Sequence, residues 1–70
     1  MNYNQLYRKL GQRIENIRRQ KGMTQEKLAE EADLHRAYFW DIEQGRNISV
    51  KTAYKIAKAL GVKLRDLFDF

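Results

Sequence analysis

Cysteine and proline are absent from this sequence of 70 residues, and histidine occurs only once. The absence of cysteine excludes a disulfide framework and any cysteine-based zinc site. One histidine cannot build a metal centre alone, so we expect no metal and no cofactor. No apolar run approaches the roughly 18 residues of a membrane span, and the N-terminal stretch lacks the hydrophobic segment of a signal peptide. We therefore expect a cytoplasmic protein that does not contact a membrane.

No repeat, low-complexity segment or linker interrupts the chain, which predicts a single domain over residues 1–70. Hydrophobic residues make up 43% and charged residues 33%, a composition typical of a folded helical domain rather than of a disordered chain. A domain this small buries only about 60% of the surface that its unfolded chain exposes. A partner subunit would therefore add stability.

Positive charge is concentrated in two parts of the chain. The net charge is +5, with six basic side chains against one acidic in residues 1–22 and six against two in residues 46–70. Residues 23–45 between them carry six acidic side chains and two basic ones. The overall sign points to a polyanionic partner. Attraction to phosphate is expected to come mainly from the two basic flanks.

Hydrophobic spacing predicts an all-α fold of five helices. The expected ranges are residues 4–21, residues 24 to the Asp33-Leu34 corner, and residues 35–44, 50–60 and 64–68. Leu6, Leu10, Ile14 and Ile17 form the expected core stripe of the first helix. Val50, Ala53, Ile56, Ala57 and Leu60 form that of the fourth. Glycine follows three of these helices, as is common where a helix ends.

The second and third helices, over about residues 24–44, predict a helix-turn-helix motif. Thr24 is a good N-cap residue for the first of them, and Asp33 stands where a tight corner needs a residue that tolerates a left-handed backbone. Phe39 and Ile42 lie on one side of the second helix. In such a motif the first helix crosses the DNA backbone while the second lies in the major groove.

A family resemblance covers about residues 10–68. The stretch GMTQEKLAEEADLHRAYFWDIEQG, with LGQRIENIRRQK before it and KIAKALGVKLRDLF after it, resembles the lambda-repressor-like helix-turn-helix family, also called XRE or Cro/C1 type. Within this family, RNISVKT is most similar to the controller proteins of restriction-modification systems. The resemblance implies a compact five-helix domain. It also implies a transcriptional regulator that binds double-stranded DNA sequence-specifically.

The second motif helix carries the candidates for reading bases. Arg36, near its N-terminus, can donate two hydrogen bonds to guanine O6 and N7, although a phosphate contact or a solvated arginine is the alternative. Ala37 offers a methyl group to a thymine methyl or is simply small, and Tyr38 offers a hydroxyl. Controller proteins often carry Arg-Thr-Tyr at these three positions, so Ala37 departs from their pattern. Trp40 is expected to contact DNA or another protein or to be half-buried, and Asp41 to accept from cytosine N4 or to repel phosphates.

Phosphate contacts are expected from residues around the motif. The family uses a glutamine at the position of Gln25 for this purpose, and a helix N-terminus suits an anion. His35 stands where the family usually has a capping serine or threonine, so it contacts DNA or replaces the cap. A second phosphate clamp is expected around the N-terminus of the fourth helix, where Ser49 also serves as a cap. Its candidates are Arg46, Asn47, Ser49, Lys51 and Thr52.

Two further expectations concern structure and assembly. Arg18 and Glu43 match a family ion pair that joins the first helix to the end of the recognition helix. A homodimer on a palindromic operator is expected, with half-sites about 34 Å apart, because one small domain contacts few base pairs. The predicted dimer surface comprises Leu64, Leu67, Phe68 and Phe70. In the alternative, the first three belong to the core.

Two other functions stay open at this point, and catalysis is not expected. An antitoxin or antirepressor would use the same fold to bind a protein, through an exposed patch of Trp40 and Phe70. A non-specific nucleic-acid binder would depend on the basic flanks alone. The acidic residues form no constellation with a nucleophile or with histidine, so we expect no enzyme.

Overall fold

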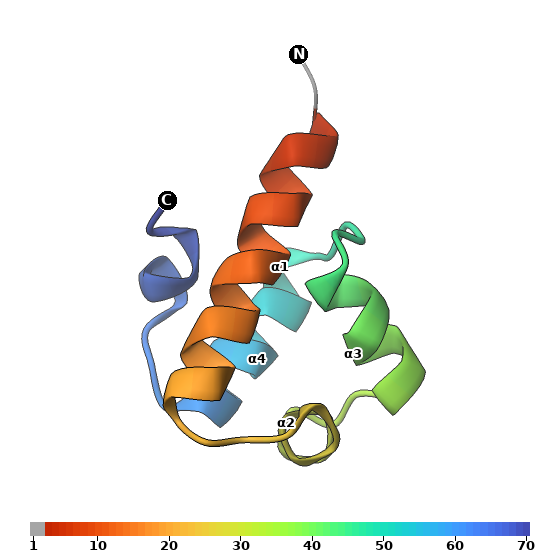
Figure 1. Cartoon of the computed structure of the whole chain (residues 1–70), viewed down its shortest axis with the longest axis vertical. Coiled ribbons are helices and arrows are strands. Elements are labelled where there is room, and N and C mark those ends of the chain that lie inside the picture. The colour runs from red at the N-terminus through yellow and green to blue at the C-terminus, as the bar shows by residue number, and fades with distance from the viewer. Residues whose placement is uncertain (1–2) are drawn as a thin grey trace.

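The computed structural model describes residues 3–70. Within this range the chain forms four α-helices and a short 3₁₀ helix, and no strand (Figure 1). Their bounds are α1 Tyr3–Gln20, α2 Gln25–Glu31, α3 Arg36–Glu43, α4 Val50–Leu60 and η1 Leu64–Phe68. The all-α class is confirmed. The predicted fifth helix is present over the predicted residues 64–68, as a short turn with the tighter 3₁₀ geometry that is common in such short pieces.

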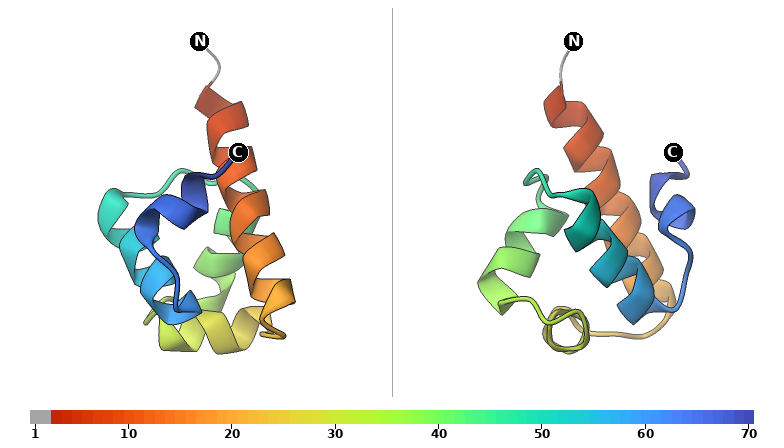
Figure 2. Two further views of the ribbon diagram at one scale, coloured as in Figure 1. Left: turned by 90° about the vertical axis from the view of Figure 1, so that its left-hand side faces the viewer. Right: turned by 180° about the vertical axis from the view of Figure 1, so that it is seen from behind.

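Helix α1 runs through the middle of the molecule. Figures 1 and 2 show α3 on one side of α1 and η1 on the other, with α4 packed between them. Gly11 lies where α1 approaches α3, since a Cβ added there would come within 2.8 Å of the Glu43 carbonyl oxygen. The two helices therefore pack closely at this glycine, and its small size sets the distance between α1 and α3.

Local capping explains where the helices begin. The Thr24 hydroxyl accepts from the Lys27 N–H at 3.0 Å at the start of α2, and the Ser49 hydroxyl accepts from the Thr52 N–H at 3.1 Å at the start of α4. Between α2 and α3 the backbone turns at Asp33, whose φ is 57°. Both predicted caps and the predicted left-handed corner are confirmed, because each depends on a side chain or backbone within a few residues.

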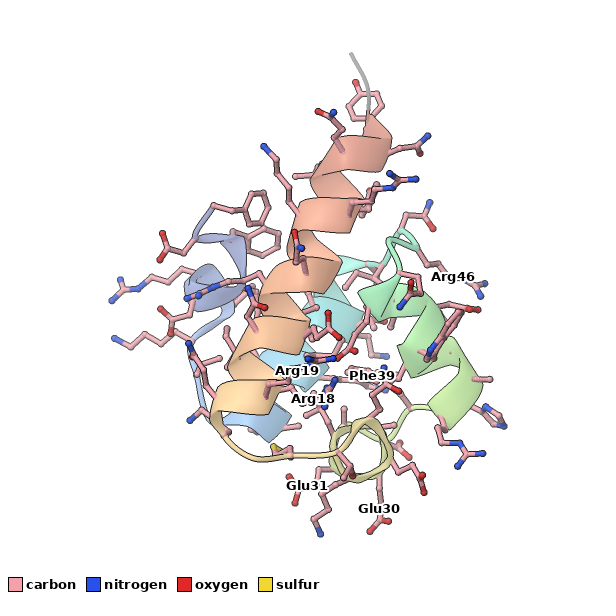
Figure 3. The ribbon with its side chains drawn as sticks, in the orientation of Figure 1. Arg18, Arg19, Glu30, Glu31, Phe39 and Arg46 are labelled. Atoms are coloured by element: carbon pink, nitrogen blue, oxygen red, sulfur yellow. The ribbon has the colours of Figure 1, made fainter. Side chains whose placement is uncertain are left out.

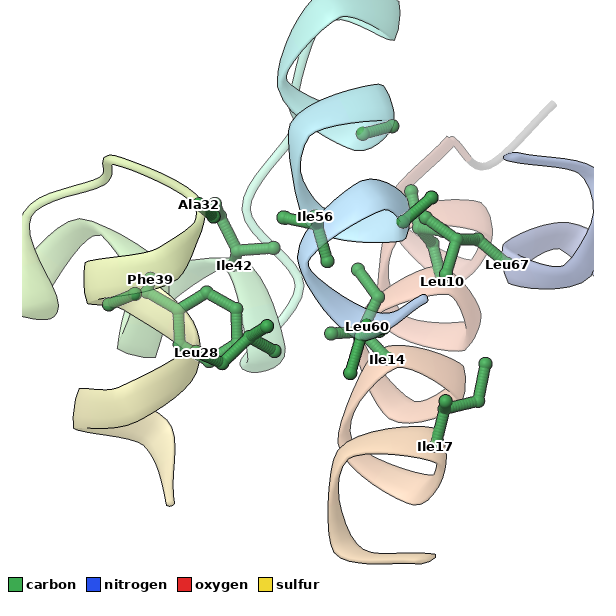
Figure 4. Close-up of a cluster of buried hydrophobic side chains, with 13 residues drawn as sticks. Leu10, Ile14, Ile17, Leu28, Ala32, Phe39, Ile42, Ile56, Leu60 and Leu67 are labelled. Atoms are coloured by element: carbon green, nitrogen blue, oxygen red, sulfur yellow. The ribbon is translucent and has the colours of Figure 1, made fainter. Parts of the chain in front are cut away.

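The core lies where α1, α2, α3 and α4 meet (Figure 4). Phe39, Leu28 and Ile42 fill the part between α2 and α3, and Ile14 and Ile56 join α1 to α4. The remaining buried apolar residues are Leu10, Ile17, Ala29, Ala32, Ala53, Ala57, Leu60 and Leu67. This packing holds α3 with its opposite face turned outward.

Three core or surface predictions are wrong. Leu6 is 42% exposed, because the first turns of α1 extend beyond the other helices (Figure 1). Val50 is 71% exposed, because it is the first residue of α4 and lies at the surface. Leu67, predicted for the dimer surface, is fully buried in the core of its own domain, whereas Phe68 and Phe70 are about half exposed and Leu64 is partly buried.

Candidate nucleic-acid interface

An open groove of about 840 Å³ lies between α1, the start of α2 and the outward face of α3. Its lining residues are Glu15, Arg18, Arg19, Thr24, Gln25, Glu26, Arg36, Ala37, Trp40, Asp41 and Gln44. The residues from α3 recur three or four positions apart, which places them on one side of that helix. Phe39 and Ile42, on the other side of α3, are buried. The predicted reading helix therefore presents a continuous face to this groove.

Arg36 is the first residue of α3 and lies at the edge of the groove. Its Nη1 lies 3.2 Å from Glu26 Oε1, and the side chains of the two residues are 67% and 71% exposed. An exposed pair of this kind is weak. The guanidinium is therefore available to a ligand that approaches the groove.

Trp40 lies one turn after Arg36 on the same side of α3. It is the only tryptophan of the chain and is 51% exposed. Ala37, also exposed, lines the groove beside it. Trp40 is therefore an exposed large apolar residue, and its contact with DNA or with another protein stays a prediction. Its ring presents a flat apolar surface to any partner of α3.

Tyr38 lies outside the groove and is partly buried against the core. The Arg46 guanidinium stacks over its ring, 4.9 Å from the ring centroid. Arg46 also pairs with Asp41, with Nη1 3.2 Å from Oδ2. Asp41, expected to read cytosine or repel phosphates, thus neutralises a neighbouring arginine in the free protein. The Tyr38 ring packs against the guanidinium of that arginine.

Two predicted phosphate contacts have other partners in the free protein. Gln25 Nε2 donates to Glu43 Oε1 at 2.8 Å, which leaves one N–H of its carboxamide. The Ala37 N–H donates to His35 Nδ1 at 3.1 Å, so His35 caps α3. Because His35 is exposed and uses only Nδ1 for the cap, Nε2 remains for a phosphate oxygen. Each side chain can therefore combine a structural contact with a contact to DNA.

The predicted second clamp lies around the loop between α3 and α4, outside the groove. Figure 3 shows Arg46 beside α3 at this end of the helix. Asn47 and Lys51 are exposed, while Thr52 is partly buried. Ser49 Oγ caps α4 and donates to Thr52 Oγ1 at 3.1 Å, so its hydroxyl hydrogen is already used. Arg46, Asn47 and Lys51 are the members of the clamp best placed to meet a phosphate.

A buried hydrogen-bond network holds together the helices that form the groove. Arg18 Nε donates to Glu43 Oε2 at 2.8 Å, and Arg18 Nη1 donates to the Met23 carbonyl oxygen at 2.7 Å. The Arg18 and Glu43 side chains are 9% and 0% exposed. With Gln25, these residues join the end of α1, the start of α2 and the end of α3. The structure thus contains the ion pair that the family resemblance implied, and it holds the two motif helices against α1.

Four lining residues of the groove were not singled out from the sequence, namely Glu15, Arg19, Glu26 and Gln44. Gln44 follows Trp40 by four positions, so helical spacing alone could have placed it on the same face. Arg19 pairs with Glu15 at 2.9 Å beside the groove. Glu26 was not recognisable, because its contact with Arg36 depends on how α2 and α3 cross.

Trp40 and Phe70 do not share a surface hollow. Trp40 lines the groove of α3, whereas Phe70 lines a separate hollow over α1 with Lys9 and Asp69. The patch expected for an antitoxin or antirepressor therefore has no support in this arrangement. Among residues 3–70, no cluster of His, Cys, Asp or Glu could hold a metal ion, and no helix in this range is long and apolar enough to cross a membrane.

Known helix-turn-helix proteins resemble this chain over most of its length. The helix-turn-helix family HTH_3 matches residues 14–67. Control protein C.BamHI of Bacillus amyloliquefaciens is 56% identical over 62 residues, which cover 86% of this chain and 76% of that protein. The restriction-modification controller protein C.AhdI of Aeromonas hydrophila has a TM-score of 0.86 at 41% identity, over 89% of this chain and 96% of the other.

A nucleoprotein complex of C.Esp1396I is a further structural relative. Its TM-score is 0.80 at 34% identity, and the match covers 93% of this chain and 96% of that one. The resemblance to helix-turn-helix proteins, and among them to restriction-modification controllers, is thereby confirmed. The chain belongs to the HTH_3 helix-turn-helix family.

Proposed function

We propose that this protein is a controller-type regulator that binds duplex DNA sequence-specifically as a homodimer. As a member of the helix-turn-helix family, it is a DNA-binding transcriptional regulator. One observation carries the sequence-specific part of the proposal. Arg36 is exposed at the N-terminus of α3, on the face that also presents Trp40 to the groove. That end of a recognition helix is the one that contacts base edges.

The proposed docking places α3 in the major groove and α2 across the backbone. Arg36 then donates to O6 and N7 of a guanine. Arg46 and Lys51, beyond the C-terminal end of α3, meet phosphates and fix the position of the helix without reading bases. The control proteins among the relatives support a role in a restriction-modification system.

Selection from a random duplex library at near-physiological salt, followed by sequencing, tests the proposed function. We expect a palindromic motif with a guanine in each half-site and half-site centres about 34 Å apart, one helical turn. Retained binding without any enriched motif would remove the sequence-specific part of the proposal. Enrichment of a single half-site would instead contradict the dimer.

The proposed dimer surface is a corrected version of the predicted one. Leu6, Val50 and Phe68 line an apolar hollow of about 160 Å³ with neighbouring residues from α1, from α4 and from the loop before α4. All three are exposed, although each is large and apolar, and an exposed apolar cluster is typical of an association site. The Phe70 ring lies beside that of Phe68, tilted by 42°, with ring centroids 6.4 Å apart. Burial of this surface in a second copy would add the stability that a small domain lacks.

Val50→Glu is expected to convert the dimer into a folded monomer. A charge on the apolar surface opposes its burial, while an acidic residue in the first turn of α4 is favourable to the helix. Sedimentation velocity measures the change, and circular dichroism checks the fold. Ala37→Glu, in the first turn of α3, is the matched control: it should keep the dimer and lose DNA binding. A dimeric Val50→Glu protein would contradict this choice of surface.

Asp41→Asn is expected to raise affinity for all duplexes by about two- to fivefold, the effect of one exposed ion pair. The change frees Arg46 to contact a phosphate. The plot of log affinity against log salt concentration should therefore become steeper by about one released counterion. Titration followed by Trp40 fluorescence at several salt concentrations measures both effects. Asp33→Asn removes the same charge at a corner that suits asparagine and serves as the control. A loss of affinity for the selected duplex alone would instead assign Asp41 to a base.

A further inference from the structure

The ion pair between Arg36 and Glu26 joins the first residue of α3 to the second residue of α2 across the mouth of the groove. The neighbouring arginines have carboxylate partners of their own: Arg19 pairs with Glu15 at 2.9 Å and Arg18 with Glu43 at 2.8 Å. Glu26 is thus the carboxylate that pairs with Arg36. Both side chains are more than two-thirds exposed.

Stability gives no sufficient reason for this pair. An exposed ion pair contributes little to folding, and α2 and α3 are already joined by the buried contact of Leu28 with the core around Phe39 and by the hydrogen bond from Gln25 to Glu43. A negative charge in the first turn of α2 is favourable to that helix, but any acidic residue there would have this effect whether or not it reached Arg36. The position of Glu26 opposite the reading arginine is therefore the feature to explain.

We infer that Glu26 is a specificity-determining residue that directs Arg36 to guanine and away from phosphate. The inference rests on the proposed function. A guanidinium has five N–H donors, and the pair uses one edge of Nη1, so Nε and Nη2 still present two parallel donors. Guanine O6 and N7 are neutral acceptors that can bind these donors while the carboxylate stays in place. A phosphate is instead attracted by the positive charge of Arg36, and Glu26 already neutralises that charge.

Glu26 therefore lowers the affinity of Arg36 for the backbone of unrelated duplexes. Without Glu26, Arg36 is an exposed cation on a flexible side chain and can bind the backbone of any duplex. With Glu26, binding the backbone gains little, whereas binding a correctly placed guanine keeps its hydrogen bonds. The acidic residue thus widens the difference between operator and unrelated DNA rather than raising affinity itself.

Glu26→Gln tests the inference, with Glu30→Gln as the matched control. Glu30, labelled in Figure 3, lies one turn further along the same helix and is exposed, whereas the partner of Arg36 is Glu26. Both variants remove one negative charge from α2. We expect Glu26→Gln to raise affinity for a scrambled duplex about two- to fivefold more than Glu30→Gln does, with no such gain on the duplex selected from the library. The ratio of the two affinities should therefore fall only in Glu26→Gln.

A second comparison separates this role from a structural one. The preference for guanine over adenine at the selected position should weaken in Glu26→Gln and recover partly in Glu26→Asp. In a protein that already carries Arg36→Ala, changing Glu26 should not alter this preference. Unfolding midpoints should stay close to that of the unchanged protein. Equal behaviour of Glu26→Gln and Glu30→Gln on a confirmed motif would overturn the inference while leaving the proposed function intact. Absence of any motif in the library would overturn the proposed function, and the inference with it.

Discussion

Replacement of Glu43 by alanine is expected to destabilise the domain by about 3–5 kcal/mol, the cost of leaving a buried charge without its partner. The Arg18 guanidinium is 9% exposed, and two of its nitrogens bind the Glu43 carboxylate at 2.8 and 3.3 Å. Gln25 would lose its acceptor in the same change. Since small domains have only a few kcal/mol of stability, we expect a largely unfolded protein. Urea unfolding followed by circular dichroism measures the loss.

Two variants serve as controls for this result. Glu15→Gln removes a carboxylate that lies 3.9 Å from Arg18 and is 31% exposed, and it should change stability little. The double change Arg18→Met with Glu43→Leu removes both buried charges, so it should recover much of the stability that Glu43→Ala loses. If Glu43→Ala unfolds at the same urea concentration as Glu15→Gln, the network does not hold the motif helices in place.

Arg36→Ala is expected to weaken binding to the selected duplex by about 5- to 150-fold, corresponding to the 1–3 kcal/mol of a bidentate contact to guanine. Affinity for a scrambled duplex should fall much less, because base contacts add nothing there. The side chain is 67% exposed, so its removal opens no cavity and leaves the fold unchanged. Trp40, which lines the same groove, reports both titrations through its fluorescence.

Arg65→Ala is the matched control for charge. Arg65 is an exposed basic residue on η1, which lies on the other side of α1 from α3 (Figure 2). Its loss lowers the net charge by the same amount without touching the groove, so it should reduce both affinities slightly and equally. Equal losses on the two duplexes in Arg36→Ala would make Arg36 a phosphate contact and not a reader of bases.

Features that depend on a few consecutive residues were predictable from the sequence. Thr24 and Ser49 cap α2 and α4 as expected, and Asp33 has the left-handed backbone that the corner requires. The bounds of α4 match the prediction, and those of α1 differ by one residue at each end. In each case local hydrogen bonding or backbone freedom decides the structure.

Features that depend on the placement of whole helices were not predictable. The spacing of Leu6 fits the core stripe of α1, but the helix extends past the elements that would cover it. Val50 likewise fits the stripe of α4 and lies at its exposed start. The site shows the same limit, because the contact of Arg36 with Glu26 joins residues of two helices whose crossing no local pattern reveals.

The most direct test of base reading by α3 is a chemical change in the DNA. In the selected duplex, the guanine of each half-site is replaced by 7-deazaguanine, which lacks the N7 acceptor in the major groove. We expect a loss of affinity of roughly tenfold or more for the unchanged protein, and no further loss for Arg36→Ala. An unchanged affinity, or an equal loss in both proteins, would contradict the placement of Arg36 at that guanine.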